Sequence, residues 1–332
     1  MNEAPPHKSV LRNLVAFAFA GAIVYYGARS VSWSQVAEAS GHATLWLFLS
    51  ASLAGFLCWF VGETVLYSRL FSYFYGSTEM RELLPTMASV YFLQLINSYV
   101  ASGAYVLFLH ARKRVPWIAS GCTLLFLAYL DVMLLAALSL SAISLVPTSP
   151  IWPGRYYVAG VLVAGCLIAS FWRFWGARLS RDSWLRWFYE RPSMSSFRTV
   201  RPAQVVKLLS IRSAIALGAG LALYGQFASF HIHVPMVQVL ALTPLVVAIG
   251  NSPFSPGGFG STQLVFTIGF ARFADKSDLF ALSLAVCAFN LLIRIPMGLA
   301  MGAPLEEAVE VKRAYAAKSV SAVNVLRSGA GS

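Results

Sequence analysis

The sequence is poor in charge. Asp, Glu, Lys and Arg make up only 11% of the 332 residues, whereas hydrophobic residues make up 58%. Soluble domains carry about 25% charged residues, so this composition excludes an ordinary soluble protein. The mean hydropathy of +0.67 instead predicts an all-α polytopic membrane protein. The chain also lacks any long polar stretch that would form a separate domain, so we expect residues 1–332 to form a single integral membrane domain.

Cysteine is scarce as well. The four cysteines fall inside apolar runs and show no paired metal-ligand spacing. They predict small core residues rather than a disulfide framework or a metal site, and nothing in the sequence indicates a cofactor. No acid/base pair suited to catalysis is visible either, and we therefore expect a protein that is not an enzyme.

The apolar residues are arranged in runs that suit membrane helices of about 20 residues. Two further apolar regions are interrupted: 83–109 is broken around Asn97–Gly103, and Pro235–Phe273 is broken at Gly250–Thr262. Six uninterrupted runs predict full spans: Leu11–Ala28, Leu45–Leu66, Ile118–Val146, Tyr156–Trp172, Val205–Phe230 and Leu279–Met301.

The placement of basic residues distinguishes two topologies. If both interrupted regions cross the membrane, the 23 basic residues outside the spans divide 14 to 9 between its two faces. If both are re-entrant helical hairpins, the same residues divide 19 to 4. The second division fits the positive-inside rule far better, and it predicts six full spans, two re-entrant hairpins and cytoplasmic termini.

This topology has an internal symmetry. Residues 10–146 read as span, span, hairpin, span, and residues 156–302 read the same way from the opposite side. The sequence therefore predicts an inverted repeat, an arrangement in which secondary transporters place their site at the repeat interface. Residues 173–207 are predicted to form a basic, aromatic cytoplasmic loop between the repeats, and residues 303–332 a cytoplasmic tail.

The break in the second interrupted region is the main candidate site. An ordinary extramembrane turn is the alternative interpretation of Gly250–Thr262, but non-helical backbone at membrane depth occurs where it lines a cavity. The glycines allow positive φ values and close approach of a ligand, and Ser261 and Thr262 are candidate caps of a returning half-helix. The free amides at such a helix start suit a phosphate. The candidate binding residues here are Asn251, Ser255, Gly257, Gly258, Gly260, Ser261, Thr262 and Gln263.

Ionisable residues within spans are further candidates. Asp131 and Arg294 lie midway along the last spans of the two repeats, so they are plausible neighbours. Two interpretations stay open: a buried Asp131–Arg294 ion pair, or an Arg294 that binds an anionic headgroup through its guanidinium. For Arg212 we expect a structural role near the membrane interface. Glu63 is either a coupling carboxylate or part of a loop network with Arg69, and we favour the loop network.

The basic loop interleaves tryptophans with arginines, which is typical of a segment that lies against anionic lipid. Ordinary positive-inside flanking residues with an aromatic belt explain the same pattern. Nothing resembles a folded nucleic-acid reader, so no nucleic-acid partner is expected.

The motif Ser252–Gly260, reading SPFSPGGFG, resembles the P-x-S-P-G-G-x-G signature of the lysylphosphatidylglycerol synthase transmembrane region family. That family includes the flippase-like domain of bacterial multiple peptide resistance factors. Asn97 and Gly103 resemble its earlier Asn…Gly motif, and Arg294-Ile-Pro296 its late Arg-containing helix. The chain departs from the family where a Glu is usual and Gln263 stands, and where Ala101 and Ala104 flank the earlier Gly.

The resemblance implies lipid translocation without the aminoacyl-transferase domain of the full-length enzymes. It also implies a multi-pass protein of the bacterial cytoplasmic membrane, whose partners are lipids with an anionic or phosphate-bearing headgroup. We therefore expect a lipid flippase-like transporter that works by alternating access. The alternative is a non-transporting accessory or scaffold for a lipid- or envelope-modifying enzyme.

Overall fold

A computed structural model describes residues 33–95, 98–145, 195–250 and 260–301, together with residues 160, 163, 165–168, 170 and 190. This part of the chain contains helices and no strand, as expected for an all-α membrane protein. The helices are α2 (Trp33–His42), α3 (Leu45–Tyr75), α4 (Met80–Gln94), α5 (Ser98–Lys113), α6 (Trp117–Leu145), α9 (Ser195–Thr199), α10 (Pro202–Ser229), α11 (Met236–Gly250), α12 (Ser261–Gly269) and α13 (Lys276–Met301).

Four helices are long and apolar enough to cross a membrane, namely α3, α6, α10 and α13. They correspond in position to four of the six predicted full spans. The predicted span Leu11–Ala28 lies outside the described residues, and only residues 160, 163, 165–168 and 170 of Tyr156–Trp172 are described.

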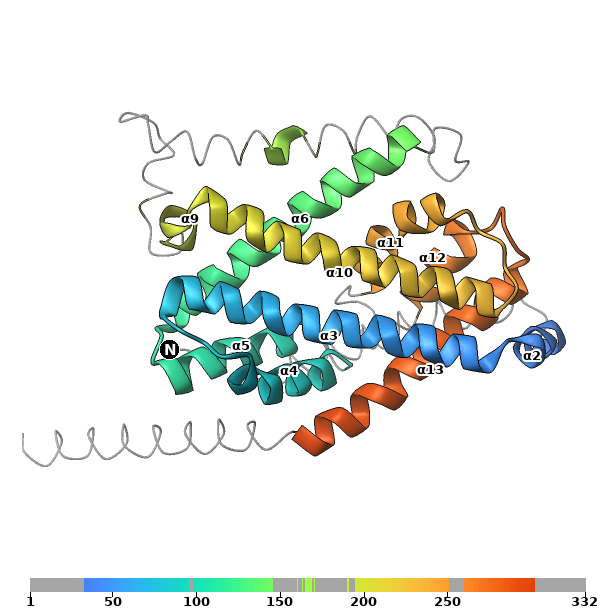
Figure 1. Ribbon diagram of the computed structural model, residues 1–332, viewed down its shortest axis with the longest axis horizontal. Coiled ribbons are helices and arrows are strands. Elements are labelled where there is room, and N and C mark those ends of the chain that lie inside the picture. Colours follow the sequence, from blue (N-terminus) through green and yellow to red (C-terminus); the bar gives the residue numbers. More distant parts are fainter. Residues whose placement is uncertain are drawn as a thin grey trace, which may run out of the picture.

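The two central helices, α3 and α10, run side by side through the middle of the molecule (Figure 1). Each contributes glycines to their contact. A Cβ atom on Gly62 would lie 2.5 Å from Ile215 of α10, and one on Gly225 would lie 2.8 Å from Ala51 of α3. Small residues allow membrane helices to approach closely and gain dispersion energy where lipid provides no hydrophobic driving force. The central pair is therefore held by close backbone approach.

Each interrupted region forms two short helices that pack against each other. In the first region α4 packs against α5, and in the second α11 packs against α12. The two pairs lie at opposite ends of the central helices (Figure 1). Each pair also packs against a long helix from the other half of the chain. Helix α4 packs against α13, and α11 packs against α6, so the contacts between the halves are reciprocal.

The first break is shorter than the sequence suggested. The segment Ser98–Gly103 is helical because α5 begins at Ser98, and α4 ends at Gln94. Gly103 lies inside α5 and not at a hairpin tip. Isolated glycine costs only about 1 kcal/mol within a helix, so its presence is weak evidence for a break.

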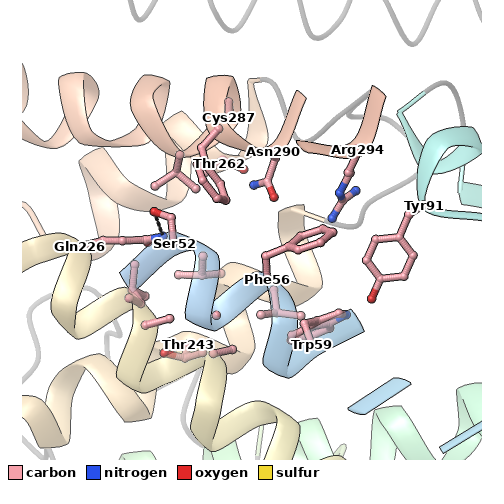
Figure 2. Close-up of a pocket in the computed structure, with 18 of the residues that line it drawn as sticks. Ser52, Phe56, Trp59, Tyr91, Gln226, Thr243, Thr262, Cys287, Asn290 and Arg294 are labelled. Carbon is pink, nitrogen blue, oxygen red and sulfur yellow. Dashed lines mark hydrogen bonds between the residues drawn. The ribbon is translucent and has the colours of Figure 1, made fainter. Parts of the chain in front are cut away.

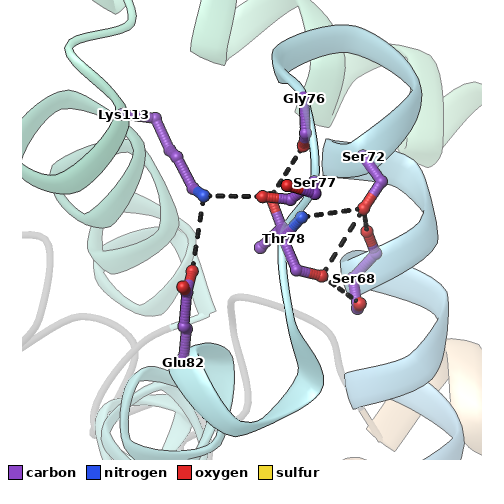
Figure 3. Close-up of polar contacts among 7 residues, drawn as sticks. All are labelled: Ser68, Ser72, Gly76, Ser77, Thr78, Glu82 and Lys113. Atoms are coloured by element: carbon purple, nitrogen blue, oxygen red, sulfur yellow. Dashed lines mark hydrogen bonds and ion pairs between the residues drawn. The ribbon is translucent and has the colours of Figure 1, made fainter.

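Polar contacts close the turn between α3 and α4 (Figure 3). Ser68 donates from Oγ to the carbonyl of Thr78 at 2.6 Å. Lys113, in the last turn of α5, donates to the carbonyl of Ser77 at 2.8 Å and forms an ion pair with Glu82 at 3.3 Å. These contacts tie the first short-helix pair to the end of α3. This end of the molecule is thereby fixed relative to the central helices.

Candidate functional site

A cavity of about 220 Å³ opens between the central helices and the second short-helix pair. Figure 2 shows that its polar side chains come from separate helices and converge on one space. Ser52 of α3 and Gln226 of α10 are joined by a 3.0 Å hydrogen bond on one side, and Asn290 and Arg294 of α13 lie on the other. We call this space the Arg294 cavity.

Apolar and aromatic side chains form most of the rest of its wall. They include Phe56 and Trp59 of α3, Val247 of α11, Phe266 of α12 and Phe289 of α13. Binding sites commonly combine such walls with a few convergent polar groups, which fix the orientation of the ligand. The Arg294 cavity has this composition.

Arg294 is the basic residue among those that line the cavity. Its Nε is buried and has no hydrogen-bond partner, and no ion pair forms between this guanidinium and the described residues. Its Cζ lies 5.1 Å from the ring centroid of Tyr91, a cation–π contact. The side chain as a whole is only half-buried, because its end reaches the cavity. Leaving a charged donor without an acceptor is costly, so this guanidinium is suited to an anionic ligand.

The start of α12 forms another edge of the cavity, where Thr262 borders it. Gly260 precedes the helix with φ 84° and ψ −60°, a backbone conformation that strongly favours glycine. Gln263 Oε1 accepts a hydrogen bond from the Gly260 N–H at 2.6 Å, and its Nε2 donates to Cys287 Sγ at 3.5 Å. Gln263 therefore stabilises the start of α12 and joins it to α13.

Two predictions about this segment can now be compared with the structure. The positive φ of Gly260 and a helix that begins after it are as expected. Ser261 and Thr262 are the first two residues of α12 and not its caps, because Gly260 occupies the N-cap position. Both side chains are buried.

A second polar cluster lies beside the cavity and is centred on Arg212. Its Nη1 donates to Glu63 Oε1 at 2.8 Å, and its Nη2 donates to Asp131 Oδ2 at 3.0 Å. The Nε lies 2.7 Å from Asp131 Oδ1, which is an ion-pair distance without hydrogen-bond geometry. We call Glu63, Asp131 and Arg212 the Arg212 triad.

The triad corrects three expectations. Asp131 pairs with Arg212 and not with Arg294, although the sequence made Arg294 a plausible neighbour. Arg212 does not extend to the interface, since its side chain is only 17% exposed and binds two carboxylates. Glu63 forms its ion pair with Arg212 and not with Arg69. The reason is that α10 lies along α3, which brings Arg212 to Glu63.

The triad and the Arg294 cavity are physically connected. Tyr91 donates a hydrogen bond from its hydroxyl to Glu63 Oε2 at 2.9 Å. The ring of the same tyrosine makes the cation–π contact with the Arg294 guanidinium. Glu63, Tyr91 and Arg294 all line the cavity. A second cavity of about 250 Å³, bordered by Asp131 and Arg212, lies at the far end of the triad. We call it the Asp131 cavity.

The remaining predicted site residues divide into two groups. Gly103 is described but lines neither cavity. The others lie outside the described residues: Asn97, Asn251, Ser255, Gly257 and Gly258.

Sequence reasoning identified Arg294 but missed other polar residues of the Arg294 cavity, among them Ser52, Cys287 and Asn290. Cys287, Asn290 and Arg294 line it together and follow one another at helical intervals of three and four residues. Ser52 and Glu63 likewise lie on one face of α3 with Phe56 and Trp59. That periodicity of polar residues within an apolar helix was the signal that could have identified them.

Comparisons with known proteins give one family match. The chain matches the lysylphosphatidylglycerol synthase TM region over residues 13–298, and no aminoacyl-transferase domain is matched. No curated protein matches the chain. The matched range contains every described helix that lines either cavity except the last residues of α13. The chain therefore belongs to the lysylphosphatidylglycerol synthase transmembrane region family.

Proposed function

We propose that the protein is a lipid flippase-like transporter that moves an anionic or phosphate-bearing amphiphile across the membrane. The observation that carries this proposal is the Arg294 guanidinium, which borders a cavity at a helix junction with its buried Nε unpaired. Membership of the family supports a role connected with membrane lipids.

The dimensions of the cavity suit a headgroup. Sites for drug-sized ligands enclose about 300–1,000 Å³, and the Arg294 cavity is smaller. A headgroup bound there would leave its acyl chains in the bilayer. The start of α12, next to Thr262, adds the partial positive charge of a helix N-terminus to that of Arg294. Phosphate is the headgroup chemistry that these two features favour together.

Alternating access between two inverted repeats is the mechanism that we propose. Its support is the reciprocal packing of the short-helix pairs and a set of equivalent positions that share one interval along the chain. In this arrangement α4–α5 and α11–α12 would be the re-entrant hairpins, and their movement would expose the cavity to either face. The equivalent positions are Gly55 and Gly218, Gly62 and Gly225, Ser98 and Ser261, and Asp131 and Arg294.

Reconstitution in vesicles of phosphatidylcholine and phosphatidylglycerol tests this proposal. Acyl-labelled fluorescent phosphatidylglycerol would be followed by quenching from outside, with protein-free vesicles as the baseline. We expect faster loss of protected fluorescence with the protein, and a parallel experiment would use a labelled polyprenyl phosphate. Transport of neither lipid above the baseline would refute the flippase function and leave the accessory role as the alternative.

Variants of α13 test the site itself. Arg294→Gln removes the charge and should slow transport about 10- to 100-fold, because hydrogen bonds to charged groups contribute about 1.5–3 kcal/mol. Leu292→Ala is a matched control, since Leu292 lies two residues away and its side chain is 75% exposed. Size-exclusion profiles would show that both variants fold. Equal transport rates in Arg294→Gln and Leu292→Ala would exclude Arg294 from the site.

A further inference from the structure

Two arginines and two carboxylates are joined, through Tyr91, into one connected set at the centre of the molecule. Arg294 lies on the ring of Tyr91, the Tyr91 hydroxyl binds Glu63, and Arg212 joins Glu63 to Asp131. With both carboxylates ionised, the two acidic and two basic groups carry no net charge. The set is therefore balanced only while the Arg294 cavity holds no further anion.

Binding of a phosphodiester at Arg294 would upset this balance. The added negative charge would leave the connected set with one excess negative charge among apolar helices, and uncompensated charge at membrane depth is expensive. We infer that the binding of an anion at Arg294 is coupled to the uptake of one proton by Asp131. This inference rests on the proposed function, because it takes the Arg294 cavity to be the anion site.

Asp131 is the carboxylate best placed to take the proton. Its side chain is 34% exposed and borders the Asp131 cavity, whereas the Glu63 side chain is only 9% exposed. Glu63 also accepts hydrogen bonds from both Arg212 and Tyr91, which fixes it as an acceptor. Protonating Asp131 would leave the hydrogen bonds of Glu63 with both Arg212 and Tyr91 intact.

The titratable groups nearest to Asp131 come from α3 and α10. Arg212 faces it from α10, and Glu63 and Tyr67 are close to it from α3. Helix α11 has no titratable side chain. Among the titratable side chains of α5 and α9, Tyr105 stacks on Tyr67, His110 stacks on Trp117, Lys113 pairs with Glu82, and Arg198 is half-buried.

A proton fits this place better than a metal ion does. Apart from Asp131 and Arg212, the Asp131 cavity is lined by apolar side chains and Trp59, which offer no metal ligand. A proton needs a single carboxylate oxygen. In the coupled step a hydronium ion transfers one proton to an Asp131 oxygen and becomes water as the anion binds. The O–H bond of Asp131 breaks when the anion leaves, and the proton returns to a water molecule.

Calorimetry on the purified full-length chain tests this coupling. The probe is dihexanoyl phosphatidylglycerol, a soluble phosphodiester whose single charge does not change over the pH range used. Binding enthalpies in buffers of different ionisation enthalpy give the number of protons taken up. We expect about one proton per bound anion, and a dissociation constant that rises with pH by up to about tenfold per pH unit where this uptake occurs.

Two isosteric variants locate the proton. Asp131→Asn mimics the protonated carboxyl, so the probe should bind with no proton uptake and with a dissociation constant independent of pH. Glu82→Gln, which removes a carboxylate outside the connected set, should keep the proton uptake of the wild type. Wild-type binding without proton uptake, or uptake that persists in Asp131→Asn, would overturn the coupling.

The proposed function fails in a distinguishable way. If the wild type gives no binding heat with the probe, or if Arg294→Gln binds it as tightly as the wild type, the anion site is wrong and the coupling falls with it. Proton uptake retained in Asp131→Asn would refute Asp131 as the carrier. Melting curves of both variants would confirm that they are folded before titration.

Discussion

Removal of the shared cation of the Arg212 triad should destabilise the protein severely. Arg212→Met keeps a side chain of similar length but leaves Glu63 and Asp131 without their counter-charge. Breaking a buried ion pair by removing one partner costs about 3–5 kcal/mol, and this applies to Glu63, which is almost fully buried. The pair with Asp131 adds about 1 kcal/mol, because that carboxylate is one-third exposed and partly screened.

Thermal unfolding of the detergent-solubilised protein measures this effect. For a chain of this size about 1 kcal/mol corresponds to about 2 °C, so the expected loss of about 4–6 kcal/mol lowers the melting temperature by about 8–12 °C. Arg272→Gln is the matched control, because Arg272 is exposed and stacks only on Phe273. Its melting temperature should change by no more than about 1 °C.

A neutral triad provides the decisive comparison. When Glu63→Gln and Asp131→Asn are added to Arg212→Met, no uncompensated charge remains, and at least half of the lost stability should return. The reasoning is refuted if Arg212→Met has the same melting temperature as the wild type. It is also refuted if the triple variant is no more stable than the single one.

Three further substitutions probe contacts around the cavity, each followed by the melting temperature. Gly298→Leu should destabilise the protein by about 1–3 kcal/mol or more, because a Cβ at Gly298 would collide with Phe92; normal melting would show that α4 and α13 are not packed as described. Gln263→Leu should cost about 1–3 kcal/mol by leaving the buried Gly260 N–H without its acceptor, whereas Gln263→Glu retains an acceptor and should melt higher than Gln263→Leu. Tyr91→Phe keeps the ring against Arg294 and loses only the hydroxyl bond to the triad, so a cost of about 2 kcal/mol is expected, and an unchanged melting temperature would argue against that bond.

Hydropathy was sufficient to predict the helical class and the long helices. The runs at Leu45–Leu66, Val205–Phe230 and Leu279–Met301 each correspond to a membrane-length helix. Both interrupted regions also gave paired short helices, because proline, glycine and small polar residues interrupt a run that is otherwise apolar. These features depend on local composition, which a single sequence displays directly.

The pairing of the buried charges was not predictable in the same way. Hydropathy identified Glu63, Asp131, Arg212 and Arg294 as residues within membrane segments, but it gives neither the direction in which a side chain points nor the register between helices. Asp131 and Arg294 lie midway along the last spans of the two predicted repeats, which suggested that they meet. Positions related by a two-fold axis meet only if they lie near that axis. In the structure each of the two borders a different cavity.

The length of the central helices has a consequence for the membrane around the protein. Helix α3 has 31 residues and α10 has 28, which correspond to about 46 Å and about 42 Å at a rise of 1.5 Å per residue. The hydrocarbon core of a bilayer is about 30 Å thick, so the pair must tilt or project beyond it. In a thicker bilayer the same pair would stand more upright. Because the two short-helix pairs are attached at its opposite ends, acyl-chain length would then alter how far apart they are held across the membrane.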